Sequence, residues 1–291
     1  MIVVLCSILV MISLISGQEC TSAEDCYSRA QTLYSQENYD EAIAYLERAL
    51  VLDPVHIDAV TLLGIIYSET ERYEKALHYF EKTTQLQPEK AYHWYYMGLT
   101  LNMLDRPTEA VSSLEKALEL NPSFKCAWYE KGFSLMLLQE YDAALDCYDE
   151  AIAVDPSDPW MYFMKADALK ILSRYEEAVL TYDEALQLNE EFVEAWVEKA
   201  HALMNLARYG EALTCLERAL EQDPEHERAR SYKENIEKEM EREGIQLEES
   251  TAPQGSDTAS GEKENGICTG SLILAILVLA GIIAEKENTD E

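Results

Sequence analysis

Basic side chains are scarce in this chain. It has 23 lysine and arginine residues against 55 aspartate and glutamate residues, and its formal net charge is −32. A protein that binds nucleic acid or anionic lipid electrostatically needs a basic face against the phosphate groups. The composition therefore argues against nucleic acid and against electrostatic docking on a membrane. The acidic surface indicates a well-solvated exterior, adaptation to salty surroundings, or attraction for a basic partner whose binding would weaken with salt.

Catalytic, cofactor and metal motifs are also missing. The sequence contains no Ser-His-Asp or Cys-His set, no phosphate-binding loop and no GxGxxG turn. None of the seven cysteines forms a CxxC pair, and no histidine lies at metal-ligand spacing from a cysteine. We therefore expect a protein that is not an enzyme and that needs neither a cofactor nor a metal.

The cysteines carry two further expectations. Cys147 and Cys215 share one position of the repeat described below but lie two repeats apart, so we expect two buried thiols and no bridge. Cys20 and Cys26 flank the start of the first predicted helix. They form a disulfide if that end of the protein faces an oxidising space, and otherwise stay reduced.

One pattern of 34 residues occurs six times in the sequence. Its clearest copy reads Trp94, Met97, Gly98, Leu101, Ala110, Leu114, Ala117 and Pro122, and the copy after it reads Trp128, Lys131, Gly132, Leu135, Ala144, Tyr148, Ala151 and Pro156. The copies start at Ala23, Ile57, Ala91, Lys125, Pro159 and Val193 and cover residues 23–226. A fixed period of this length is typical of a solenoid in which one helix pair stacks on the next.

The spacing within each copy predicts the two helices. Apolar side chains at positions 4, 7, 8 and 11 share one helix face, and those at positions 20, 24 and 27 share a face of a second helix. Small residues at positions 8 and 20 allow close approach, and large residues at positions 4, 11 and 24 fill the space around them. The Asp-Pro, Gln-Pro or Asn-Pro step at positions 31 and 32 ends the second helix.

The third and fifth copies depart from the pattern, and a further helical segment comes after the last copy. Pro107 replaces the usual tyrosine of the third copy, which predicts that it opens the second helix. Glu190 replaces the proline of the fifth copy, which predicts a less sharply fixed turn. After the last copy, large apolar residues recur every four positions within residues 227–243, as expected for an amphipathic capping helix.

These residues resemble the tetratricopeptide repeat (TPR) family over about residues 23–226. The resemblance implies an all-α fold, a right-handed α-solenoid of stacked helix-turn-helix repeats, that holds another protein on the concave face lined by the first helices. In that family, positions 2, 5, 9 and 12 point to the concave face. The resemblance thus implies an aromatic and apolar protein-binding groove made by Tyr92, Tyr95, Leu99, Tyr129, Phe133, Trp160 and Phe163.

The partner expected there is a protein or peptide with large apolar anchor residues. Some relatives clamp a C-terminal carboxylate with lysine at position 5 and asparagine at position 9. This chain has Tyr27 and Gln31, Thr61 and Ile65, and Tyr95 and Leu99 at those positions, so the clamp is absent. Two alternatives stay open. The aromatic side chains either bind a partner or pack between adjacent first helices. The protein is either a scaffold or assembly factor, or a self-associating structural protein.

Apolar segments lie at both ends of the chain. Residues 1–17 are uncharged and predict either a cleaved signal peptide or an N-terminal anchor. Residues 267–284 are eighteen uncharged residues and predict a transmembrane helix. A flexible linker over residues 245–266 precedes it, and an acidic tail over residues 285–291 follows it. We expect a membrane-tethered protein with extracytoplasmic repeats, and a cytoplasmic arrangement is the alternative.

Overall fold

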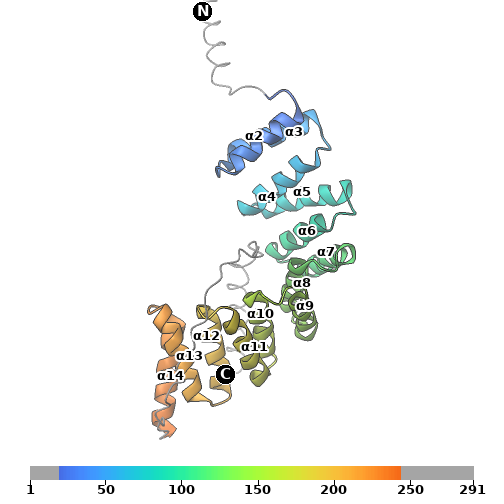
Figure 1. Cartoon of the computed structure of the whole chain (residues 1–291). Helices are drawn as coiled ribbons and strands as arrows, with labels where there is room; N and C mark the ends of the chain where they lie inside the picture. Colours follow the sequence, from blue (N-terminus) through green and yellow to red (C-terminus); the bar gives the residue numbers. More distant parts are fainter. Residues whose placement is uncertain (1–19, 244–291) are drawn as a thin grey trace, which may run out of the picture. The chain divides into compact units, whose positions relative to one another are not determined.

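The computed structural model describes residues 20–243, and within them it contains thirteen α-helices and no strand (Figure 1). The chain divides into two compact units between Leu104 and Asp105. The predicted signal or anchor of residues 1–17, the linker of residues 245–266, the transmembrane helix of residues 267–284 and the tail of residues 285–291 lie outside the described residues. No helix within residues 20–243 has the length and hydrophobicity that a bilayer-spanning segment needs.

Unit 1 is described from residue 20 to residue 104. Its helices are α2 (Ala23–Tyr34), α3 (Tyr39–Leu52), α4 (Ile57–Glu69), α5 (Tyr73–Leu86) and α6 (Ala91–Met103). Helices α2 and α3 pack as one pair and α4 and α5 as the next, while α3 contacts α4 and α5 contacts α6. Leu46, Leu63, Ile66 and Phe80 are fully buried between them. The apolar residues of the repeat thus form one core shared by neighbouring pairs.

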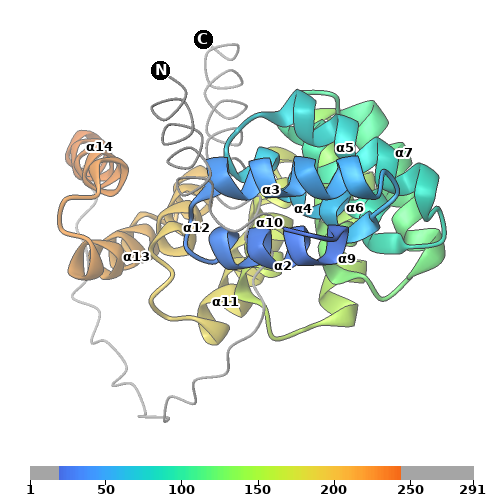
Figure 2. The same cartoon turned by 90° about the horizontal axis from the view of Figure 1, so that it is seen from above.

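Unit 2 is described from residue 105 to residue 243. Its helices are α7 (Pro107–Leu120), α8 (Lys125–Leu137), α9 (Tyr141–Val154), α10 (Pro159–Ile171), α11 (Tyr175–Leu188), α12 (Val193–Asn205), α13 (Tyr209–Gln222) and α14 (Glu227–Glu243). Each even-numbered helix from α8 to α12 pairs with the helix after it, and Figures 1 and 2 show α14 beside α13. The prediction of an all-α fold of stacked helix pairs is confirmed for the described residues, and Pro107 opens α7 as expected.

In two repeats, an aromatic ring of the second helix lies directly against a glycine of the first helix. A Cβ atom built on Gly132 would lie 2.7 Å from a ring carbon of Tyr148, and one built on Gly64 would lie 2.6 Å from a ring carbon of Phe80. Both rings are buried. These two glycines are therefore required for close approach of the helices, because any side chain would displace the ring.

The turn between the two helices of a pair has the same backbone conformation in all six repeats. Its position 15 adopts a positive φ of 54° to 61°. The six residues there are Glu37, Glu71, Asp105, Gln139, Ser173 and Ala207. In the sixth repeat, the N–H of Arg208 then donates to the carbonyl of Leu203 across 2.9 Å, which closes the end of α12. The hydrogen bonding at the end of the first helix thus imposes the left-handed conformation, and none of the six residues that adopt it is a glycine.

A second recurring contact joins repeats three to six, and the terminal helix α14, to the repeat before each of them. The side chain at position 4 donates a hydrogen bond to the backbone carbonyl at position 32 of the preceding repeat. The donor is Trp94 to Pro88 at 2.8 Å, Trp128 to Pro122 at 2.8 Å, Tyr162 to Pro156 at 3.3 Å, Trp196 to Glu190 at 2.9 Å and Arg230 to Pro224 at 2.9 Å. The register between successive repeats is therefore fixed by polar contacts as well as by packing.

The turn at Glu190 is no looser than the others. Helix α11 ends at Leu188, the position at which α9 also ends relative to its repeat. The Asn189 side chain accepts from the N–H of Glu191 at 3.0 Å, and Asp155 makes the same bond to Ser157 at 3.1 Å. The expected effect of the missing proline is absent because the side chain at position 31 and the bond from Trp196 hold the turn.

The first helix is fixed at its start by a disulfide between Cys20 and Cys26, with Cα atoms 5.1 Å apart. Ser22 caps the same helix by accepting from the N–H of Asp25 at 3.1 Å. Cys147 and Cys215 are free and buried, as expected. Burial raises the pKa of each thiol to about 11, so both are protonated and unreactive at neutral pH.

We predict that Ala207→Gly stabilises the protein. Alanine at φ 54° carries the steric cost of a left-handed conformation, which glycine does not. After the added entropy of the unfolded chain, the free energy of unfolding rises by about 0.5 kcal/mol. Ala44→Gly, at an exposed site inside α3, is the control and lowers it by about 1 kcal/mol. Denaturant unfolding followed by circular dichroism measures both changes, and a loss of stability in Ala207→Gly contradicts the prediction.

We also predict opposite effects of removing two buried hydroxyl groups. Tyr148 is fully buried, and its hydroxyl has no hydrogen-bond partner among the described residues. Tyr182, one repeat later, donates to the carboxylate of Asp167. Tyr148→Phe is expected to leave the free energy of unfolding unchanged or raise it, whereas Tyr182→Phe lowers it by about 2 kcal/mol. Equal losses in the two variants would show that the hydroxyl groups contribute through volume alone.

Candidate functional site

The first helices of unit 1 carry tyrosines beside carboxylates. Tyr27 lies on α2, Asp58 on α4 and Tyr92 on α6, and Tyr92 is 40 % exposed. Glu24 and Glu89 are exposed next to them in sequence. We call these five residues the first-helix face of unit 1. Glu24, Asp58 and Tyr92 all occupy position 2 of their repeats, because each first helix presents the same side after 34 residues.

Contacts between neighbouring first helices hold one end of this face in place. The rings of Tyr27 and His56 lie 5.3 Å apart between centroids, and Nε2 of His56 is 3.3 Å from a carboxylate oxygen of Glu24. Nδ1 of His56 accepts from the N–H of Ala59 at 3.3 Å, so this histidine also caps α4. The α2 side of the face is therefore tied to the start of α4.

The tyrosines of this face lie in a negative electrostatic environment. Partial burial, followed by the charges of Asp58 and Glu24, raises the pKa of Tyr27. Partial burial, followed by the charges of Asp58 and Glu89, raises the pKa of Tyr92. The charge of Asp58 on α4 thus affects a ring of α2 and a ring of α6. The combination of partly accessible rings and nearby carboxylates suits a cation carried on an apolar stem.

The first helices of unit 2 carry four buried aromatic side chains, at positions 2, 5 and 9 of their repeats. Tyr129 and Phe133 on α8 are each 1 % exposed, and on α10 Trp160 is 8 % and Phe163 5 % exposed. The ring of Trp160 stacks on Phe192 with centroids 5.5 Å apart, and the ring of Phe163 packs against Phe192 at a tilt with centroids 4.9 Å apart. Trp160 also donates from its ring nitrogen to the hydroxyl of Tyr129 at 3.2 Å. These rings form an aromatic cluster within the described residues of unit 2.

A buried ionic network lies next to this cluster. Lys170 on α10 is paired with Asp167 at 3.1 Å and with Glu198 of α12, and Glu198 accepts from Arg228 of α14 at 2.7 Å. Tyr182 of α11 donates to Asp167. The Asp167, Lys170 and Glu198 side chains are each at most 4 % exposed. Two acidic and two basic groups balance, so the network is electrically neutral.

The network changes the protonation of its members in predictable directions. Burial alone would lower the pKa of Lys170, but Asp167 and Glu198 outweigh it and raise the pKa. Burial likewise would raise the pKa of Glu198, but Lys170 and Arg228 hold it below its usual range. Burial raises the pKa of Asp167 despite the nearby lysine. The lysine and Glu198 are therefore charged at neutral pH, and the network ties four helices together.

Of the seven side chains predicted to line a groove, only Tyr92 is exposed. Tyr95 and Leu99 on the same helix are 9 % and 7 % exposed, and the four from α8 and α10 are buried as described above. The expected exposure of the aromatic patch is therefore wrong for six of the seven, because neighbouring side chains such as Phe192 cover them. Their role in binding stays a prediction.

Sequence reasoning missed Phe192 and the ionic network. Phe192 precedes α12 at the last position of its repeat, where the repeat pattern specifies no residue type. Asp167 and Lys170 lie three residues apart on a helix face with many apolar residues, and Glu198 and Arg228 occupy the following helices. That pattern of opposite charges on an otherwise apolar face is the signal that would have indicated the network.

No group of three or more histidine, cysteine, aspartate or glutamate side chains within the described residues has the arrangement of a metal site. The absence of a metal, of a cofactor and of catalysis stays an expectation from the sequence.

Family models for the tetratricopeptide repeat match most of residues 23–236. Five such models match residues 23–89, 61–123, 126–158, 147–179 and 171–236. No curated protein sequence matches the chain.

Several solved structures have the same fold. MamA is 23 % identical, with a TM-score of 0.55 over 58 % of this chain and 92 % of its own. PilW, described as a widely conserved type IV pilus biogenesis factor, is 19 % identical, with a TM-score of 0.65 over 72 % and 97 %. YrrB, described as a TPR protein with an unusual peptide-binding site, is 25 % identical, with a TM-score of 0.53 over 60 % and 90 %. The family models, together with the helix pairs and the period of 34 residues, show that the chain belongs to the tetratricopeptide repeat family.

Proposed function

We propose that this protein is an interaction scaffold that holds a segment of another protein on the first-helix face of unit 1. The observation that carries the proposal is the exposure of Tyr92, whose pKa is raised by the charge of Asp58, in contrast to the burial of Trp160 at the same repeat position in unit 2. Accessible aromatic residues are frequent anchors of protein interfaces. The peptide-binding site described for YrrB, which shares the fold, supports the same class of function.

The chemistry of the face specifies the partner further. The rings of Tyr27 and Tyr92 offer apolar area for large side chains, and the carboxylates of Glu24 and Asp58 attract lysine or arginine. The partner segment therefore combines apolar anchors with basic residues. Since the carboxylates are exposed, the association rate falls as the salt concentration rises.

We further propose that the protein is tethered to a membrane with its repeats on the extracytoplasmic side. The uncharged segment 267–284 supports the tether, and the Cys20–Cys26 disulfide supports an oxidising compartment. The alternative is that the repeats are cytoplasmic. The membrane tether and the location of the repeats are both independent of which residues bind the partner.

The binding face is tested with a photoreactive amino acid at Tyr92 of the full chain, followed by purification of the protein that it captures. The same amino acid at His78, exposed on second helix α5, is the control. We expect capture from position 92 only. The combined variant Tyr92→Ala, Asp58→Asn is then expected to weaken binding of that purified partner by about a hundredfold.

A stability measurement separates this face from the buried cluster. Tyr92→Ala is expected to change the free energy of unfolding by less than about 0.5 kcal/mol. Phe133→Ala removes a buried ring and is expected to lower it by about 3 kcal/mol or more. If Phe133→Ala instead keeps its stability and loses the partner, while Tyr92→Ala binds normally, the binding face lies on unit 2 and the proposal is wrong.

Topology is tested by adding protease to intact cells. Extracytoplasmic repeats are expected to be digested without lysis, and a free-thiol reagent is expected to leave Cys20 and Cys26 unmodified until a reductant is added. Resistance of the repeats in intact cells, with digestion after permeabilisation, would contradict the proposed side of the membrane.

A further inference from the structure

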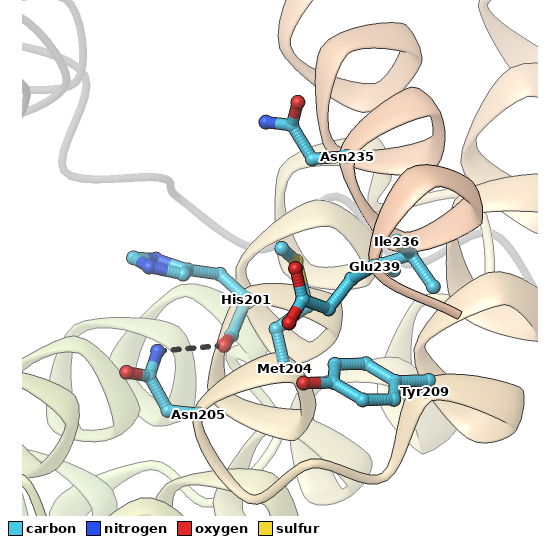
Figure 3. Close-up of a pocket in the computed structure, with 7 residues that line it drawn as sticks. All are labelled: His201, Met204, Asn205, Tyr209, Asn235, Ile236 and Glu239. Carbon is cyan, nitrogen blue, oxygen red and sulfur yellow. Dashed lines mark hydrogen bonds between the residues drawn. The ribbon is translucent and has the colours of Figure 1, made fainter. Parts of the chain in front are cut away.

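A separate pocket lies between repeat six and the terminal helix, distant in sequence from the face proposed above. Its volume is about 320 Å³, near the lower end of the range for ligand pockets. Figure 3 shows side chains from α12 and α13 facing side chains from α14 across it. All seven lining residues belong to unit 2, and one of them, His201, also lies 4.0 Å from a carboxylate oxygen of Glu198 in the ionic network.

The floor of the pocket is apolar and its edge is polar. Ile236 of α14 is 1 % exposed, and Met204 of α12 and the ring of Tyr209 are partly buried beside it. Asn205 and Asn235 are exposed at the edge. The amide nitrogen of Asn205 donates to the carbonyl of His201 at 3.0 Å, which leaves its side-chain oxygen directed elsewhere (Figure 3). The pocket therefore suits a ligand with an apolar stem and a polar end.

The charge of the lining specifies that polar end. Glu239 is the one carboxylate among the lining residues, and lysine and arginine are absent from them. Its side chain reaches from α14 towards Met204 (Figure 3) and is 29 % exposed. Arg242 pairs with it from the next turn of the same helix, but Arg242 is 73 % exposed. A solvent-exposed pair of this kind contributes little, so an incoming cation can replace Arg242.

We propose that this pocket binds an arginine or lysine side chain presented by a segment of a partner protein. The methylene groups of that side chain pack on Met204, Tyr209 and Ile236, and its cationic group pairs with Glu239. The net charge of −32 favours such a partner at long range. The pocket thus gives the array a second contact for a basic partner, at the end opposite in sequence to Tyr27.

The test uses the full chain and a dye-labelled pentapeptide, Gly-Leu-Arg-Leu-Gly, with fluorescence polarisation as the measurement. Its matched probe replaces arginine by citrulline, which keeps the shape and removes the charge. Binding is expected to weaken about tenfold for the citrulline peptide and about tenfold for the variant Glu239→Gln. Glu237→Gln, an equal charge change at an exposed site of the same helix, is expected to bind normally. Asp58→Asn is also expected to bind normally, which separates this pocket from the first-helix face.

Several outcomes would overturn the proposal. These are equal binding of the arginine and citrulline peptides, equal losses in Glu239→Gln and Glu237→Gln, and the absence of binding by the full chain. Binding that requires removal of residues 244–291 would show that the chain's own C-terminal segment competes for the pocket, and would overturn a partner as occupant. Circular dichroism of Glu239→Gln checks that α14 is intact, and the double variant Glu239→Gln, Arg242→Gln repeats the test without the internal pair.

Discussion

The contact between a glycine on the first helix and an aromatic ring on the second sets the geometry of two of the helix pairs. At Gly132 and Gly64 the ring occupies the space of a side chain, so the two helix backbones approach closely. This closeness allows the other apolar positions to bury themselves against the next pair, because one pair alone has too few neighbours to cover them. The hydrogen bonds from position 4, such as that of Trp128 to Pro122, then fix the register of one helix pair relative to the next.

The two units use the same first-helix positions for different purposes. In unit 1, Tyr92 and Asp58 leave an acidic aromatic surface that is accessible to a partner. In unit 2, Trp160 and Phe163 pack on Phe192, and Lys170 is buried between carboxylates. Under the proposed function, the array would keep one backbone plan while separating a region for recognition from a region for cohesion.

The fold could be predicted from sequence because periodicity reports which side of a helix a residue occupies. The helix pairs, the start of α7 at Pro107 and the buried thiols of Cys147 and Cys215 all follow from it. Periodicity does not report what covers that side. The burial of Tyr95, Tyr129 and Phe133 depends on residues from other helices and connections. The site could therefore be predicted only in part, with Tyr92 as the exposed member.

The ionic network has a consequence for how unit 2 comes apart. Terminal repeats of a solenoid ordinarily fray first, since each contacts one neighbour only. Here, detachment of α14 would withdraw Arg228 from Glu198 and leave a buried carboxylate with half of its compensation. The same carboxylate holds Lys170 of the preceding repeat. Opening of α10 to α14 should therefore be cooperative, with amide hydrogen exchange of the last helix proceeding through a single larger opening of several helices.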